Sequence, residues 1–338
     1  MAVLFSDSFD HYATAEITQK WTSTSGATIT ANGRNGTSAL RINGAGGTGR
    51  VTKTVAPVST TAGGVGFAYN INTLHDQSSN QYLVGIEESG TLHLGVQLLV
   101  SGLLAVYRGT TLLGTSSSGL SAGSFYYIEF KFAIHDSTGT VDLKLNGTSV
   151  LSLTGQDTRN GGTGVWNVVA LELGVNLGYD ADYDDLVVWD TSGSVNNDFL
   201  GPIRIKAIYP DGAGNTTNFT PSAGSNFQNV DEASTDGDTT YNSEGTPGEF
   251  DLYTYGAVGV AGTVRFVQVN PMVRSDGAGS ETVRPKIRIG STNYDGTTVG
   301  VSTSYLDKLE VFNVSPATST AWTVAEIDGA EFGEELVS

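Results

Sequence analysis

The stretch VDLKLNGTSVLSL, residues 141–153, carries the clearest structural signal in the sequence. Up to Leu145 its apolar residues alternate with polar ones, which is the period of a β-strand with one buried face. Asn146 and Gly147 follow, and this dipeptide tolerates the positive φ angles of a two-residue hairpin turn. The stretch therefore predicts a β-hairpin.

The same alternation recurs upstream of this hairpin. In FYYIEFKFAIH, residues 125–135, every second side chain from Tyr126 onward is apolar and predicts the buried face of a strand. LLAVYRGTTLLG, residues 103–114, predicts a second hairpin that turns near Gly109. Helical periodicity is nearly absent. Further strands are predicted at 2–9, 38–42, 49–55, 64–72, 82–88, 91–100, 168–175 and 184–190. Antiparallel strands at this regular spacing are typical of an all-β sandwich or barrel.

The composition narrows the class of protein. There is no cysteine among the 338 residues, which excludes disulfides and thiolate metal ligands and fits folding in a reducing compartment. A formal net charge of −18 disfavours binding to nucleic-acid phosphates. No window approaches the ~18 uninterrupted apolar residues of a membrane helix, and the N-terminal MAVLFSDSFD lacks the pattern of a signal peptide. We therefore expect neither nucleic-acid binding nor membrane insertion.

A change of composition marks a domain boundary. The run TSGSVNND, residues 191–198, is polar and rich in turn-forming residues. The predicted domains are a β-sandwich at 1–195 and a second, C-terminal β-sandwich domain at 196–338. Within the second domain, residues 211–248 are rich in Gly, Asn, Ser, Thr and Asp and predict a long loop.

The long loop is the predicted assembly contact. Loops of this length usually carry function or form an interface. Its few apolar anchors are Phe219, Phe227 and Val230. We expect these three side chains to contact a neighbouring subunit.

The order of segments in the first domain resembles a known family. FSDSFDHY (5–12) opens the chain, and YDADYDDLVVWDTSG (179–193) closes the domain after the two hairpins. This order resembles the concanavalin A-like jelly roll of the laminin-G type. In that family the first and last strands lie side by side, which implies that 5–10 and 184–190 are neighbours.

The second domain carries a narrower resemblance. NNDFLG (196–201) and VDEASTDGDTTYN (230–242) are similar to segments of tailed-bacteriophage virion proteins that join a lectin-like domain to a second β-domain. The resemblance implies a non-enzymatic structural component of the virion, made in the host cytoplasm. A peripheral tail protein or fibre-like adhesin is favoured, with a head decoration protein next. The implied partners are other virion proteins, further copies of this chain and host surface glycan.

The aspartates of YDADYDDLVVWD, residues 179–190, raise the question of catalysis or metal binding. Enzymes of the concanavalin-like fold typically carry Glu-x-Asp-x-Glu on one strand, which is missing from this sequence. Glu87 and Glu88 are adjacent and therefore face opposite ways along a strand, so no catalytic residues are predicted. Hard oxygen ligands from Asp180, Asp182 and Asp184 make Ca²⁺ the candidate ion. The alternative is a solvated strand edge and turn, and no other cofactor is predicted.

Carbohydrate binding requires exposed aromatic rings beside polar groups. The candidates are Tyr82, Tyr107, Trp166 and Tyr179. The alternative for each is burial in the core. A carbohydrate-binding module for host surface glycan is therefore the second functional hypothesis, and a divergent glycan hydrolase or lyase is the third.

Overall fold

The hairpin predicted at 141–153 is present in the structure. Strands β12 (Gly139–Leu145) and β13 (Thr148–Gln156) pair antiparallel. Asn146 and Gly147 between them have φ angles of 49° and 80°, the left-handed conformation that this turn requires. The prediction from alternation and turn chemistry is confirmed.

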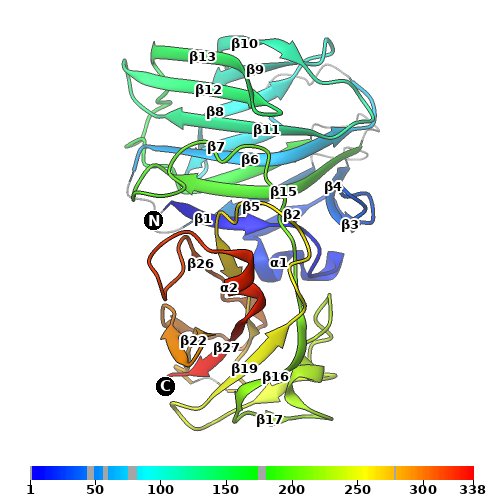
Figure 1. The fold of residues 1–338 in the computed structure, drawn as a ribbon. Helices are drawn as coiled ribbons and strands as arrows, with labels where there is room; N and C mark the ends of the chain where they lie inside the picture. The colour runs from blue at the N-terminus through cyan, green and yellow to red at the C-terminus, as the bar shows by residue number, and fades with distance from the viewer. Residues whose placement is uncertain (1, 44–48, 56–59, 75–81, 174–179, 278) are drawn as a thin grey trace. The chain divides into compact units, whose positions relative to one another are not determined.

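The computed structural model describes every residue except 1, 44–48, 56–59, 75–81, 174–179 and 278. The chain divides into two compact units, Met1–Ile205 and Lys206–Ser338 (Figure 1). The regular secondary structure of both units is almost entirely antiparallel strand, as predicted. Among the described residues, no helix has the length and apolarity needed to cross a bilayer.

The first unit is a concanavalin A-like jelly-roll sandwich of two sheets. The eight-stranded sheet has the order β13-β12-β11-β6-β15-β4-β3, with β1 beside β15. Its remaining strands are β1 (Val3–Asp7), β3 (Ala27–Thr30), β4 (Ala39–Asn43), β6 (Ala62–Ile71), β11 (Tyr126–Ala133) and β15 (Asp180–Asp190). The seven-stranded sheet has the order β10-β9-β8-β7-β14-β5-β2. Its strands are β2 (Ser23–Ser25), β5 (Gly49–Thr54), β7 (Val84–Glu88), β8 (Thr91–Leu98), β9 (Leu103–Arg108), β10 (Thr111–Gly119) and β14 (Val168–Leu173). A short helical turn, η1 (Thr14–Glu16) and α1 (Ile17–Lys20), follows β1.

Aromatic side chains join the two sheets. The Tyr183 hydroxyl, on β15 of the larger sheet, donates to the carbonyl oxygens of Leu83 and Glu172 at 2.9 and 3.2 Å. The rings of Phe132 and Trp166 meet edge to face with centroids 5.4 Å apart. Burial of these large rings supplies much of the hydrophobic stabilisation of the sandwich.

Strand β15 lies inside the larger sheet. It pairs with β6, β4 and β1, and Phe5 and Asp7 of β1 lie opposite Val188 and Leu186. The predicted neighbourhood of the first and last strands is therefore confirmed. The alternative of a solvated strand edge for the aspartates is wrong, because β15 has a partner strand on each side.

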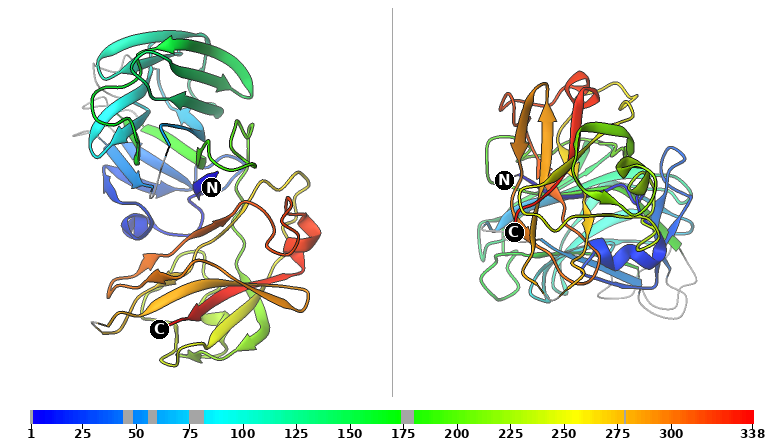
Figure 2. Two further views of the ribbon diagram at one scale, coloured as in Figure 1. Left: turned by 90° about the vertical axis from the view of Figure 1, so that its left-hand side faces the viewer. Right: turned by 90° about the horizontal axis from the view of Figure 1, so that it is seen from below.

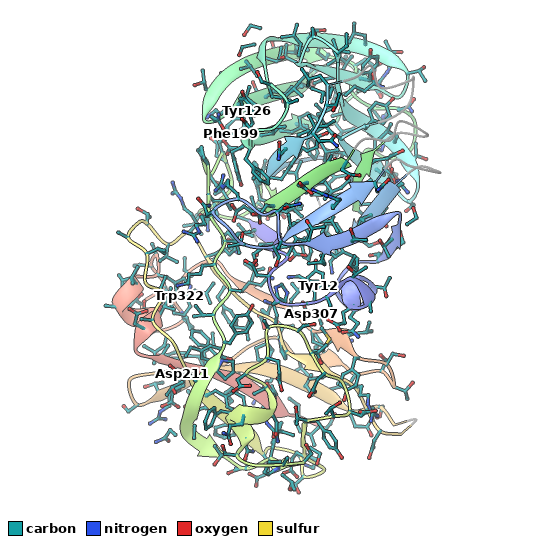
Figure 3. All side chains as sticks on the ribbon, turned by 90° about the vertical axis from the view of Figure 1, so that its right-hand side faces the viewer. Tyr12, Tyr126, Phe199, Asp211, Asp307 and Trp322 are labelled. Carbon is teal, nitrogen blue, oxygen red and sulfur yellow. The ribbon has the colours of Figure 1, made fainter. Side chains whose placement is uncertain are left out.

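The segment after β15 belongs to the first unit. The predicted boundary at 195 precedes the observed one at Ile205 by ten residues. The Gly201 amide donates to Glu129 Oε1 at 2.9 Å, and the Ile205 amide donates to Asp185 Oδ1 at 2.6 Å. Phe199 (labelled in Figure 3) has its ring centroid 4.0 Å from Lys144 Nζ. These contacts with the sheet override the turn-rich composition that suggested a linker.

The second unit is built on a six-stranded sheet of order β16-β19-β27-β22-β23, with β24 paired to β22 (Figure 2). Its strands are β16 (Pro210–Thr217), β19 (Phe250–Tyr255), β22 (Thr282–Ile289), β23 (Thr292–Asp295), β24 (Val299–Gly300) and β27 (Ala330–Leu336). Three two-stranded ribbons accompany the sheet: β17 (Thr220–Pro221) with β18 (Asn242–Ser243), β20 (Val267–Val269) with β26 (Glu310–Phe312), and β21 (Met272–Val273) with β25 (Leu306–Asp307). The helical turns are η2 (Asn226–Asn229) and α2 (Val324–Asp328). The core gathers around Ile287, Trp322 and Phe332.

The predicted loop at 211–248 is partly strand. Strand β16 covers its first residues and pairs with β19 at the end of the sheet. The sequence of β16, PDGAGNTT, has no apolar alternation because an end strand buries little side-chain surface. Its position is fixed by backbone hydrogen bonds, which composition does not reveal.

Glycines of β6 make room for aromatic rings. A Cβ atom on Gly64 would lie 2.2 Å from Cζ2 of Trp189, and one on Gly63 would lie 2.4 Å from Cζ2 of Trp166. Both tryptophans are fully buried. Neither ring can move aside without opening the packing around it.

We predict that Gly64→Ala destabilises the first unit by about 1–3 kcal/mol, the usual cost of overpacking a core. Urea unfolding of the full chain followed by tryptophan fluorescence measures the loss. Gly245→Ala is the control, because a Cβ atom there meets nothing within 4 Å. Equal stability of the two variants would contradict this account of the packing.

Candidate functional site

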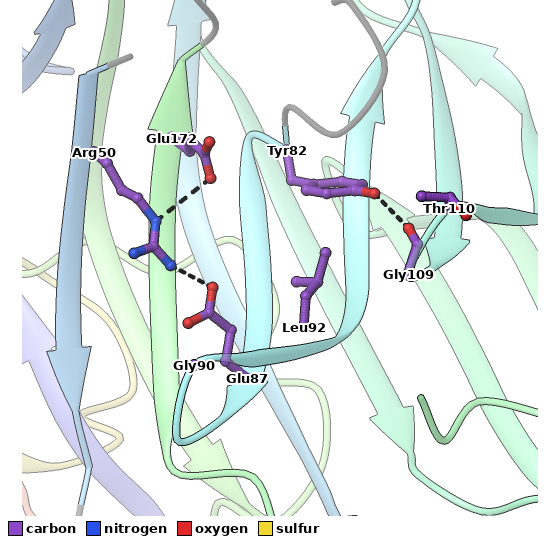
Figure 4. Close-up of a pocket in the computed structure, with 8 residues that line it drawn as sticks. All are labelled: Arg50, Tyr82, Glu87, Gly90, Leu92, Gly109, Thr110 and Glu172. Atoms are coloured by element: carbon purple, nitrogen blue, oxygen red, sulfur yellow. Dashed lines mark hydrogen bonds and ion pairs between the residues drawn. The ribbon is translucent and has the colours of Figure 1, made fainter. Parts of the chain in front are cut away.

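A pocket of about 500 Å³ lies on the seven-stranded sheet (Figure 4). The side chains of Arg50, Glu87 and Glu172 reach it from β5, β7 and β14, which are neighbours in the order β7-β14-β5. Each alternates along its strand with a fully buried apolar residue, so the three point away from the core. The complete lining is Arg50, Tyr82, Glu87, Gly90, Leu92, Gly109, Thr110 and Glu172.

One guanidinium bridges two carboxylates in this pocket. Arg50 lies directly opposite Glu172 in the β5–β14 pairing. Its Nη2 pairs with Glu87 Oε1, and its Nε lies 3.5 Å from Glu172 Oε2. Figure 4 shows the guanidinium between the two carboxyl groups. The arrangement brings two carboxylates into one pocket and fixes both in position.

Glu172 is the carboxyl group best suited to proton transfer. Burial raises its pKa to about 7, and the negative charge of Glu87 adds to the rise, although the Arg50 guanidinium opposes it. A carboxyl group with a pKa near 7 is populated in both protonation states at neutral pH. The pocket therefore holds a group that can donate or accept a proton at that pH.

Two tyrosines stand at the other side of the pocket. The Tyr82 ring lies on the backbone of Gly95, where a Cβ atom would be 2.2 Å from Tyr82 Cδ1. Its hydroxyl donates to the Gly109 carbonyl oxygen. The half-buried Tyr107 ring meets Tyr82 edge to face, with centroids 6.3 Å apart. Tyr82 is only 3% exposed, so Tyr107 offers more ring surface to a ligand.

The side of the pocket formed by Leu92 and Gly109 is held by hydrogen bonds from a neighbouring loop. Asn160 Nδ2 donates to the Leu92 carbonyl oxygen at 2.9 Å. The backbone amide nitrogen of Asn160 lies 3.1 Å from Nδ1 of His93, which is fully buried. His93 Nε2 lies 3.1 Å from Glu88 Oε2. His93 thus acts as a local hydrogen-bonding residue that positions this loop.

The other predicted carbohydrate-binding aromatics do not join the pocket. Trp166 is fully buried between the sheets, so its assignment to an exposed platform is wrong. The indole fills the space above Gly63, which explains its burial. Tyr179 lies outside the described residues.

The three aspartates predicted to bind Ca²⁺ do not converge. Asp182 forms two 2.8 Å hydrogen bonds with Arg41, and Asp180 lies 3.4 Å from the same guanidinium. Asp184 accepts instead from the backbone amide of Arg34, at 2.7 Å. Within the described ranges, no group of three or more His, Asp or Glu side chains is arranged to hold a metal ion. The Arg41 side chain pairs with Asp180 and Asp182, and backbone amides donate to Asp184, so these carboxylates already have partners.

Asp184 and Asp185 form a buried acidic pair. A β-bulge in the pairing of β15 with β6 lies between Asp184 and Val187, and Asp185 has a φ of 49°. Burial raises the pKa of Asp184 to about 8, and the negative charge of the neighbouring Asp185 adds to the rise. Burial also raises the pKa of Asp185 to about 6, although the Arg34 guanidinium opposes the shift. The sequence pattern suggested solvated aspartates, and their burial by the segment after β15 was not visible in it.

The residues of the predicted assembly contact lie in the second unit. The Phe219 amide donates to Asp251 Oδ1 at 2.8 Å. Phe227 lies in η2, and Val230 follows it; all three side chains are half-buried. The contact of these residues with a neighbouring subunit remains a prediction.

Arg50, Glu87 and Glu172 were not predicted as a group. The carboxylate pair forms between two strands, so a search for paired carboxylates along one strand does not find it. A signal was present in the charged residues of GRVTKT (49–54), VGIEE (84–88) and VVALEL (168–173), which alternate with apolar residues of the core. Only the order of these strands in the sheet brings the charges together.

Comparison with known proteins does not assign the chain to a family. No protein-family model matches the chain, and no curated protein matches it. Solved structures match part of it at low similarity. An endo-β-1,4-glucuronan lyase from the fungus Trichoderma reesei has 15% identity and a TM-score of 0.38, over 50% of this chain and 90% of the lyase. An alginate lyase in complex with an alginate tetrasaccharide has 15% identity and a TM-score of 0.40, over 54% and 95%. A sialidase has 11% identity and a TM-score of 0.41, over 55% of this chain and 18% of the sialidase.

The prediction of a non-enzymatic virion structural protein is wrong. The matching structures named above are glycan-active enzymes, not virion components. Within the chain itself, Glu87 and Glu172 share one pocket, so the missing Glu-x-Asp-x-Glu pattern does not exclude catalysis. At these TM-scores the matches do not identify a substrate.

We predict that the free energy of unfolding of the first unit falls as pH rises from about 5 to about 8. The pKa of Asp184 is about 8 in the folded protein against 3.8 ordinarily, so the folded state holds a proton that the unfolded state has released. Each such group contributes a slope of up to about 1.4 kcal/mol per pH unit. Urea unfolding at several pH values measures the slope, and Asp184→Asn should flatten it. An unchanged slope in this variant would contradict the buried acidic pair.

Proposed function

We propose that the first unit binds a glycan in the pocket lined by Arg50, Glu87, Glu172 and Tyr82, with the Tyr107 ring beside it. The arrangement that supports the proposal is a fixed row of planar polar groups beside an aromatic ring, on one face of a sheet. Sugar hydroxyl groups act as both donors and acceptors, so they match a guanidinium and carboxylates held side by side. Tyr107 supplies an apolar ring face for the C–H surface of a sugar.

The dimensions of the site are compatible with this ligand class. A pocket of about 500 Å³ lies in the range of small-molecule sites, which run from roughly 300 to 1,000 Å³. The polar groups are already in place because Arg50 is paired to both carboxylates without a ligand. A site organised before binding loses less entropy when the ligand is ordered.

We expect Arg50→Ala and Tyr107→Ala each to weaken glycan binding at least about tenfold, which corresponds to roughly 1.4 kcal/mol. A glycan array with the full chain identifies ligands, and calorimetric titration measures the affinities of the variants. Arg159→Ala is the matched control, because Arg159 pairs with Asp136 in an exposed loop outside the pocket. Binding that survives both pocket substitutions would exclude this site.

A second candidate function is hydrolysis of the bound glycan. The observation that favours it is a carboxyl group with a pKa of about 7, Glu172, in the same pocket as a second carboxylate, Glu87. Glycoside hydrolysis uses such a pair, in which one protonated carboxyl group donates to the leaving oxygen and the other acts as nucleophile or base. In this chain Glu172 would be the acid.

If the pocket cleaves glycans, Glu172→Gln should lower the rate of reducing-sugar release by at least about 100-fold, the usual contribution of a general acid. The rate of the unsubstituted protein should fall as pH rises through about 7, because Glu172 then loses its proton. Glu244→Gln in the second unit is the control. A pH-independent rate, or full activity in Glu172→Gln, would contradict the assignment.

A further inference from the structure

The charge of the pocket points to the class of glycan, on the premise that the proposed function is correct. Arg50 is the single Lys or Arg among the eight lining residues, and Glu87 and Glu172 are the two carboxylates. With both ionised, the lining carries a formal charge of −1, since one positive charge faces two negative ones. Both carboxylates already contact the guanidinium.

The other Lys and Arg residues on the strands of the seven-stranded sheet, Lys53 and Arg108, have partners outside the pocket. Lys53 lies on the same face of β5 as the buried Val51, opposite to Arg50, and its Nζ lies 4.6 Å from the Phe5 ring. Arg108 pairs with Asp157. Neither side chain is part of the pocket lining.

The stretches outside the described residues add no Lys or Arg to this balance. Their sequences are GAGGT (44–48), APVS (56–59), HDQSSNQ (75–81) and GVNLGY (174–179), and they contain no Lys or Arg. The whole chain carries a formal charge of −18. A negatively charged polymer is therefore repelled at long range as well as in the pocket.

We infer that the pocket takes uncharged sugar residues and rejects uronates. When Glu87 and Glu172 are both ionised, a uronate carboxylate entering the pocket would become a third negative group around one guanidinium. It would compete with Glu87 and Glu172 for the N–H groups of Arg50, and a carboxylate that it displaced would remain close by without its partner. Like charges and unpaired polar groups of this kind are how a site discriminates against a ligand of similar shape. A hydroxymethyl group at the same position meets no such repulsion.

If the site is catalytic, a preference for uncharged sugars favours hydrolysis over β-elimination. β-Elimination from a uronate is promoted by a positive charge or by hydrogen-bond donors that stabilise the sugar carboxylate while the adjacent proton is removed. The only Lys or Arg in the lining, Arg50, is already paired to two carboxylates. Hydrolysis of a neutral glycan requires no such cation, and the two carboxylates are the groups that it uses.

The test uses three matched pairs of hexasaccharides, each pair differing only in a hydroxymethyl or a carboxylate at C6: glucose and glucuronate, mannose and mannuronate, galactose and galacturonate. Binding to the full chain is measured by calorimetry in ~0.15 M salt. We expect at least one neutral member to bind, and its uronate counterpart to bind at least tenfold more weakly. Raising the salt concentration should narrow this difference only in part, because the groups in the pocket are partly shielded from solvent.

The variant Glu87→Gln/Glu172→Gln tests the cause. It leaves Arg50 without a carboxylate partner, so the uronate member of the pair should now bind at least as well as the neutral one. The control, Glu244→Gln/Asp276→Asn, makes the same change in net charge in the second unit and should preserve the preference of the unsubstituted protein. Thermal melting shows whether each variant is folded, and the single variant Glu87→Gln serves if the double variant is not.

The outcomes separate the two proposals. Equal or tighter binding of a uronate member by the unsubstituted protein, lost in Arg50→Ala, would overturn the selectivity and leave the glycan site standing. A preference that the pocket variant and the control alter alike would assign the selectivity to net charge and overturn it as a property of the pocket. If no hexasaccharide and no member of a wider glycan array binds, the proposed function itself is wrong.

Discussion

The register of three strands, β5, β14 and β7, is the constraint on which the site depends. Side chains alternate between the two faces of a sheet, so a slip of one residue would turn Arg50 or Glu172 into the core and bring a core residue to the surface. The fully buried Val51, Ile86 and Leu171 prevent that slip, because each would have to leave the apolar interior. The hydrophobic core thus sets the geometry of the charged groups, and the ion pairs are a consequence of it.

The parts of the fold that could be predicted from the sequence are those specified locally. The hairpin at 141–153 rests on alternation and on Asn146-Gly147, and both signals lie within the stretch itself. The site residues are specified only by strand order, since Arg50 and Glu172 are far apart in the sequence and meet through the pairing of β14 with β5. No period or spacing in one segment contains that information. The same reason applies to Asp184, whose burial depends on residues that follow the strand.

Carboxyl groups with raised pKa values occur in both units of this acidic chain. Burial raises the pKa of Glu172 to about 7 and that of Asp184 to about 8 in the first unit, and raises that of Glu334 to about 8 in the second. Glu334 lies directly opposite Asp251 across β27 and β19. In addition to burial, a neighbouring carboxylate makes the deprotonation of Glu172, Asp184 and Glu334 less favourable. A protein of this composition therefore carries protons at neutral pH that its formal charge of −18 does not count.

Residues 196–205 determine where the first unit would have to end if it were separated from the rest of the chain. Its amides at Gly201 and Ile205 satisfy carboxylates of the sheet, Glu129 and Asp185. A fusion that joined the sandwich to another protein at residue 195 would leave Glu129 and Asp185 without these hydrogen bonds. It would also expose the strands that the segment contacts. A fragment that contains the whole first unit should accordingly end at Ile205 and include residues 196–205.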